Sequence, residues 1–155
     1  MAIEFGVKID PKEAYAFKSS MPVSDNVADW GISTVESEDR ISAFLKKHAP
    51  VLKAKSYRYS SIPSVKEFLI THLQANHDIW VEYHSNEIHS YDKETGNHVH
   101  DNLIERFDPE EGTVTAIDPW PWHRQRIIIP LDVLERAIST QYGRETGFIV
   151  IEKIP

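Results

Sequence analysis

The stretch His98–Pro119 constrains the fold more than any other part of the sequence. It reads HVHDNLIERFDPEEGTVTAIDP, and its turn-forming segment is Asp108–Gly112. That segment is flanked by two short runs suited to strands, at residues 102–107 and 113–117. Such a pattern predicts a β-hairpin. Because an antiparallel hairpin folds its two ends together, we expect His100 and Asp118 to lie side by side.

A histidine beside a carboxylate has two interpretations. In the functional one, Asp118 orients the imidazole of His100, which acts as a general base or as a hydrogen-bonding group toward a ligand. In the structural one, His100 begins a strand and the Asp118-Pro119 pair makes a turn. A catalytic triad would also need a nucleophile from elsewhere in the chain.

The composition narrows the classes of protein. The chain has 155 residues, a formal net charge of −7 and no cysteine. Its length suits one domain, 1–155, with a single core. An acidic chain with few basic clusters is a poor partner for nucleic acid, and no apolar run reaches the roughly 20 residues of a membrane helix. The lack of cysteine excludes disulfides and thiolate sites. We expect a cytoplasmic protein without a cofactor, and the oligomeric state stays open.

The remaining patterns predict an α+β protein. Ser37 and Ser64 are candidate N-caps, and Pro11 is expected to begin only a loop or a helical turn. Helices are expected at 37–48, 64–75 and 130–137, and further strands at 3–9, 51–59, 78–83, 126–129 and 147–151. The polar segment 84–97 is expected to be an excursion over the surface. This order favours helices packed on a curled antiparallel sheet.

From Pro22 onward, this order resembles the papain-like cysteine peptidase superfamily, specifically the double-glycine leader peptidases of bacteriocin processing. The segment Asp29–Ser33 resembles their nucleophile segment, and the hairpin from His100 to Asp118-Pro119 resembles their catalytic hairpin. The helix 64–75 with the following DIWVEY, and the later PLDVLERA and GFIVI, also resemble family elements. The resemblance implies a papain-like fold.

The chain departs from this family at the positions of the catalytic residues. Trp30 stands at the position of the catalytic cysteine, and no glutamine is found near Asn26, where the family has its oxyanion donor. An indole cannot act as a nucleophile, and loss of both groups removes acyl transfer. The resemblance therefore implies a degenerate member that is not a cysteine peptidase.

Aromatic residues near the hairpin suggest that ligand binding has replaced peptidase activity. Trp120 and Trp122 alternate with prolines, which present the indoles on a stiff loop, or else simply cover a sheet edge. With Trp30 and Asn26, they are expected to line a cleft for a peptide or small-molecule ligand. By analogy with the family, the setting would be an accessory role in natural-product biosynthesis or peptide export.

Two other functions remain open. His100 and Asp118 could serve as general acid and base in a cyclisation, isomerisation or hydrolysis without a covalent intermediate. Alternatively, His98 and His100 share one face of a strand and could chelate a metal together with Glu105. Histidines spaced in this way are more often surface residues, so we expect no metal.

Overall fold

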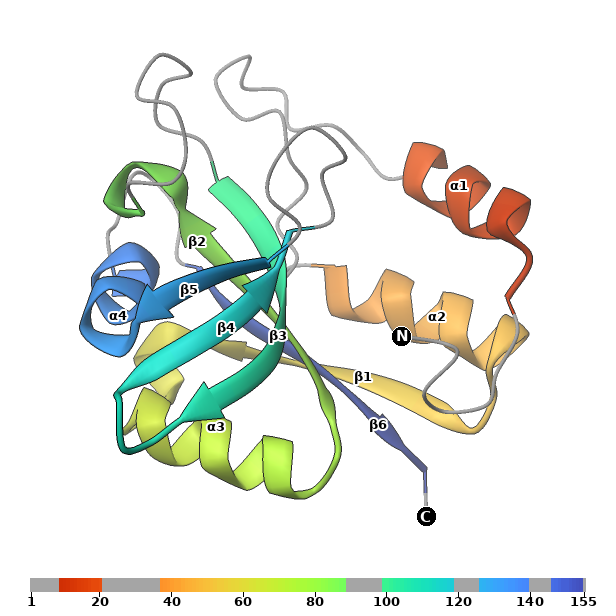
Figure 1. Cartoon of the computed structure of the whole chain (residues 1–155). Coiled ribbons are helices and arrows are strands. Elements are labelled where there is room, and N and C mark those ends of the chain that lie inside the picture. The colour runs from red at the N-terminus through yellow and green to blue at the C-terminus, as the bar shows by residue number, and fades with distance from the viewer. Residues whose placement is uncertain (1–8, 21–36, 89–98, 119–125, 140–145, 155) are drawn as a thin grey trace.

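A computed structural model describes residues 9–20, 37–88, 99–118, 126–139 and 146–154 (Figure 1). These residues form an α+β fold with a six-stranded antiparallel sheet, as the sequence predicts. In chain order, the elements are α1 (Pro11–Ser20), α2 (Glu38–His48), β1 (Leu52–Arg58), η2 (Tyr59–Ser61), α3 (Val65–Gln74), β2 (Asp78–His84), η3 (Ser85–Glu87), β3 (Val99–Asp108), β4 (Thr113–Ile117), β5 (Arg126–Pro130), α4 (Leu131–Ser139) and β6 (Gly147–Lys153).

The strands do not lie in chain order. The sheet runs β1-β6-β2-β3-β4-β5, so the last strand of the chain is inserted between β1 and β2. In the register of these pairs, Ile149 of β6 lies between Ser56 of β1 and Trp80 of β2. Among the described strands, β6 is therefore the one that connects β1 to the rest of the sheet.

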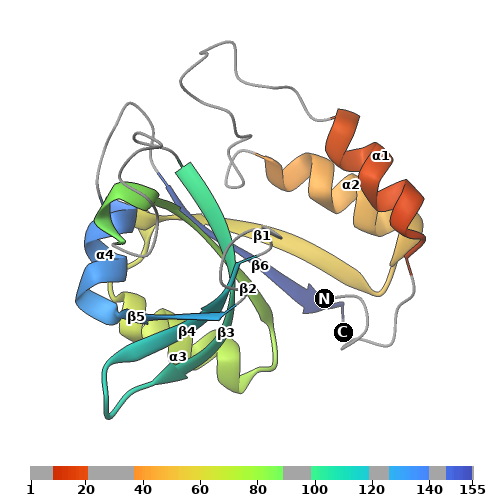
Figure 2. The same cartoon turned by 45° about the horizontal axis from the view of Figure 1, so that its top comes forward.

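A hydrophobic core packs against each face of the sheet, so its central strands are buried on both sides. In β2, Ile79, Val81 and Tyr83 pack in a cluster with residues of α3 and α4. Trp80, which points to the other face, packs in a second cluster with Leu45 of α2. Such alternation follows from the two-residue period of a strand. Figure 2 shows α1 lying along α2, on the side of the sheet where β1 is the edge.

The described helices begin largely where the sequence predicts. The side chain of Ser64 accepts a hydrogen bond from the backbone N–H of Glu67 at 3.3 Å, which is the expected cap of α3. Ser37 precedes α2, but its side chain makes no capping bond. Instead, Oε2 of Glu38 in the first turn accepts bonds from the backbone N–H and the hydroxyl of Ser56, at 2.7 and 2.6 Å. Glu38 thereby fastens α2 to β1.

Helix α1 is longer than the sequence predicts. Oδ1 of Asp10 accepts a hydrogen bond from the backbone N–H of Lys12 at 2.8 Å, so the expected start is present. The helix then continues for ten residues instead of one turn. The ring of Phe17 stacks on Phe44 of α2, with 4.4 Å between the centroids. This tertiary contact supports a helix whose own sequence has little apolar periodicity.

Two local features correct or extend the sequence predictions. His84 ends β2 and is buried, as is the following Ser85, so the surface excursion does not begin at residue 84. Gly147 at the start of β6 lies against β1, and a Cβ at this position would meet the carbonyl oxygen of Tyr57 at 2.1 Å. Only glycine fits this approach. None of the described helices is long and apolar enough to cross a membrane.

Candidate functional site

The hairpin of β3 and β4 positions the candidate site. At its closed end, Oδ1 of Asp108 accepts hydrogen bonds from the backbone N–H groups of Glu110 and Glu111, at 3.1 and 3.2 Å. Gly112 then takes a left-handed conformation, with φ at +62°. These turn residues fix the pairing of the two strands. The other end of the hairpin, where His100 and Asp118 lie, is set by the same register.

His100 and Asp118 are in direct contact. Nε2 of the imidazole lies 3.1 Å from Oδ1 of the carboxylate, which confirms the prediction that the two residues lie side by side. The Asp118 side chain is 0% exposed and that of His100 is 20% exposed. The carboxylate is thus enclosed by protein, whereas part of the imidazole reaches the surface. A buried group that orients a partly exposed one is the arrangement of a base and its orienting residue.

This contact fixes the chemistry of the ring. An ionised carboxylate can only accept hydrogen bonds, so Nε2 of His100 carries the hydrogen when Asp118 is ionised. The other nitrogen, Nδ1, then bears the basic lone pair. Proton exchange with a ligand would take place at Nδ1, while Asp118 stabilises the positive charge that protonation brings.

The ring of His100 is also held from the side. Tyr83 is the direct partner of His100 in the β2–β3 register, so both side chains lie on the sheet face that α3 and α4 cover. The two rings meet edge to face, with 5.9 Å between centroids. Tyr83 is fully buried. The imidazole is therefore restrained both by a hydrogen bond and by an aromatic contact, which limits its orientations.

The sheet is polar at the end where this pair lies. Asn102 follows His100 on the same face of β3 and is fully buried, and the neighbouring Glu82 and His84 of β2 are buried on the opposite face. Farther along the same strands, Ile79 pairs with Ile104 in the apolar core. Burying polar groups costs free energy unless they find partners. Of these residues, Asn102 shares the face of His100 and adds a buried polar side chain near the candidate site.

The described residues include only part of the predicted site. His100 and Asp118 are brought together, whereas Trp30, Asn26, Trp120 and Trp122 lie outside the residues that the structure describes. The resemblance of the nucleophile segment and the expected aromatic wall of the cleft therefore remain predictions. His98 lies outside the described residues as well.

Glu105 lies on the other face of the sheet from His100. A register shift after Ile104 places it beside Arg126 of β5, whose Nε donates a hydrogen bond to Oε2 of Glu105 at 2.7 Å. A second nitrogen of Arg126 contacts the other carboxylate oxygen. This hydrogen bonding lowers the pKa of Glu105. Within the described part of the chain, no group of three or more histidine, cysteine, aspartate or glutamate residues is arranged to hold a metal.

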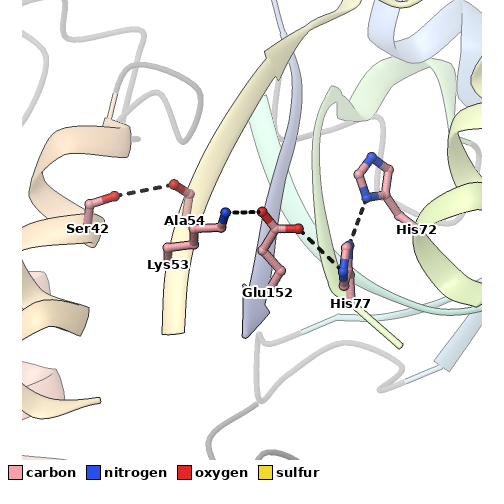
Figure 3. A network of polar contacts seen from close by, with 6 residues as sticks. All are labelled: Ser42, Lys53, Ala54, His72, His77 and Glu152. Carbon is pink, nitrogen blue, oxygen red and sulfur yellow. Dashed lines mark hydrogen bonds and ion pairs between the residues drawn. The ribbon is translucent and has the colours of Figure 1, made fainter. Parts of the chain in front are cut away.

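A second polar cluster, which the sequence did not predict, joins three parts of the fold (Figure 3). Nδ1 of His72 on α3 lies 3.0 Å from Nδ1 of His77, and Nε2 of His77 lies 3.3 Å from Oε2 of Glu152 on β6. Lys53 of β1 completes the network, with its Nζ 3.0 Å from Oε1 of Glu152. The cluster links α3 to the two strands at the sheet edge.

The two histidines of this cluster can share only one hydrogen between their facing nitrogens. Burial lowers the pKa of His72 from its ordinary value of 6.5, and the neighbouring His77 lowers the pKa further. Hydrogen bonding to Lys53 lowers the pKa of Glu152. The sequence signal was weak, because His72 occupies a helix position that is otherwise apolar and its partner is contributed by the loop after that helix.

Comparison with known proteins adds no further assignment. No protein-family model matches the chain, and no curated protein matches its sequence.

Proposed function

We propose that this chain is a cysteine-less papain-like protein that binds a peptide or small-molecule intermediate beside His100 and Asp118. The observation that carries the proposal is the 3.1 Å contact between the His100 imidazole and the Asp118 carboxylate. The hairpin pattern led us to expect this contact, and the papain-like resemblance favours a functional role for it. The α+β architecture with an antiparallel sheet is compatible with that resemblance.

The role of the pair in binding follows from its geometry. Asp118 is enclosed and fixes the ring, so the partly exposed edge of His100 is presented to a ligand in one orientation. A preoriented donor or acceptor loses little entropy when a ligand arrives. The expected tryptophans, Trp30 and Trp120, would supply apolar contact area around this polar centre. By analogy, the protein would be a cytoplasmic accessory in natural-product biosynthesis or peptide export.

The same geometry supports a second candidate function, general acid–base catalysis without a covalent intermediate. A histidine oriented by a buried carboxylate has both ring nitrogens in defined roles, with Nδ1 as the proton-exchanging atom. This function would use His100 and Asp118 in a cyclisation, isomerisation or hydrolysis. Binding and proton transfer need the same two residues, so an experiment must separate them.

A synthetic double-glycine leader peptide is a suitable probe. We expect the wild-type protein to bind it saturably, as followed by two-dimensional NMR, and mass spectrometry to recover the peptide intact. His100→Ala and Asp118→Asn should weaken binding, whereas Asp132→Asn, a change in an exposed side chain of α4, should not. A modified peptide whose formation requires His100 would select the catalytic function. Cleavage after the double glycine, or equal binding by all three variants, would contradict the proposed binding role.

A further inference from the structure

A hollow between α1 and α2 forms a second candidate binding site, separate from the hairpin of His100 and Asp118. It has a volume of about 470 Å³ and is open toward solvent. Surface clefts that hold small molecules fall in the range of about 300–1,000 Å³. Ala16 and Ala43, two small and exposed side chains, are among the residues that line it.

The floor of the hollow is aromatic. Phe17 of α1 and Phe44 of α2 stack with their ring planes inclined by 28°. The imidazole of His48, one turn beyond Phe44, continues this surface, with 4.5 Å between its centroid and that of Phe44. Nδ1 of His48 contacts Oε2 of Glu13 at 2.8 Å, so these two side chains connect the two helices. A flat apolar group would find a preformed surface here.

Two cations border this floor. Arg40 and Lys47 of α2 line the hollow and are exposed. Neither forms an ion pair with any residue in the described part of the chain. Lys47 suits the C-terminal end of a helix, but Arg40 lies in the first turn of α2, where the helix dipole disfavours a positive charge. The position of Arg40 is therefore not one that the helix dipole favours.

The charge of this site contrasts with that of the chain. The whole protein has a formal net charge of −7, yet the side chains lining the hollow include two cations, Arg40 and Lys47, and one acid, Glu13. We propose that the hollow binds a small anion with a flat apolar body, such as an aromatic carboxylate. The rings would contact the apolar body, and Arg40 and Lys47 would receive the carboxylate.

Naphthalene-2-carboxylate and its uncharged amide form a matched pair of probes for the full chain. We expect calorimetry to show saturable binding of the carboxylate and binding of the amide weaker by about tenfold, since two exposed ion pairs are lost. Amide NMR shifts should map the carboxylate to α1 and α2. Equal affinity for the two probes would overturn the proposal.

Three variants localise the binding. Ala43→Trp fills the hollow and should abolish binding of the carboxylate, while the double variant R40Q/K47Q should reduce affinity to that of the amide. Lys46→Gln removes a neighbouring exposed cation that does not line the hollow, so it should bind like the wild type. Circular dichroism would verify that each variant is folded. Undiminished binding by folded Ala43→Trp, or a loss in Lys46→Gln equal to that in R40Q/K47Q, would contradict the assignment.

Discussion

Nε2 of His100 on β3 and Oδ1 of Asp118 after β4 lie 3.1 Å apart, although 18 positions separate the two residues in the chain. The turn and the strand pairing of the hairpin bring these two residues together at its open end, and Tyr83 of β2 also contacts the imidazole. The pair lies at the opposite end of the hairpin from the turn residues Asp108 and Gly112. Its chemistry can be altered without disturbing the turn.

Asp118→Asn should loosen this pair. The amide can donate as well as accept, so Nε2 of His100 no longer has to carry the hydrogen, and both tautomers become populated. Nitrogen-15 NMR of the imidazole would measure that change. We also expect a loss of about 1–3 kcal/mol in the free energy of unfolding, because a buried charged partner is replaced.

Asp132→Asn is the matched control for this prediction. Its carboxylate contacts Arg136 one turn later on the surface of α4, at 2.9 Å. Exposed pairs of this kind contribute little, so urea denaturation should show a change within about 0.5 kcal/mol. A loss at position 132 as large as that at position 118 would contradict the structural importance of the His100 contact.

Gly147→Ala should destabilise the sheet where β6 meets β1. The added Cβ would lie 2.1 Å from the carbonyl oxygen of Tyr57, so the two strands must separate. Overpacking of this kind costs about 1–3 kcal/mol, and contact with backbone atoms favours the upper end. Urea denaturation would measure the loss.

Gly112→Ala separates this steric effect from the conformational one. Gly112 has φ at +62° but open space around it, so an alanine there loses stability only through the left-handed backbone conformation. That cost is about 1–2 kcal/mol. Gly147→Ala should therefore lose more stability than Gly112→Ala, and the reverse order would argue against the close strand approach.

Glu38→Ala should weaken the attachment of α2 to β1. Oε2 of Glu38 accepts hydrogen bonds from the backbone N–H and the hydroxyl of Ser56. The substitution leaves both of these donors without this acceptor. Bonds to a charged acceptor contribute about 1.5–3 kcal/mol each, part of which solvent restores at this half-buried position. Thermal unfolding would measure the change. Asp39→Ala removes a neighbouring exposed acid from the same helix turn and should change stability much less.

Acidification should destabilise the protein in two separate windows. The pKa of His72 is lowered on folding, so the unfolded chain binds more protons below 6.5 and stability falls as the pH drops through that value. The pKa of Glu152 is lowered from 4.5, so its contribution is lost at lower pH, as the carboxylate becomes protonated. Urea denaturation between pH 7 and pH 5 addresses the first window.

His72→Phe isolates the histidine contribution. Phenylalanine keeps the apolar contacts of the ring but cannot take up a proton, so the fall in stability between pH 7 and pH 5 should become shallower. A variant of His48, whose ring belongs to the α1–α2 contact, provides the comparison. An unchanged slope in His72→Phe would show that the pair with His77 does not govern this window.

The predictable parts of the structure were those with local causes. The hairpin of β3 and β4 follows from a turn segment and the two short runs that flank it, and Ser64 caps α3 because the required acceptor and N–H are three residues apart. Contact of His100 with Asp118 then follows from strand pairing. For the same reason, the fold class could be predicted from the order of the elements.

The unpredicted parts have causes that are distant in the sequence. The ten residues of α1 form a helix against Phe44, a contact that no pattern within α1 reveals. The network of His72, His77 and Glu152 joins a helix, a loop and a strand far along the chain. The contact of His77 with Glu152 also needs the strand order, which hydrophobic periodicity does not contain.

The place of β6 in the sheet has a consequence for biosynthesis. Of the six described strands, β6 is the last to be translated, yet it lies between β1 and β2. While the ribosome is still adding residues before Gly147, β1 has no strand to pair with among those described, and the edge of β2 that β6 will cover is open. Exposed strand edges promote aggregation. We therefore expect the nascent chain to be more prone to aggregation before β6 has paired with β1 and β2 than after.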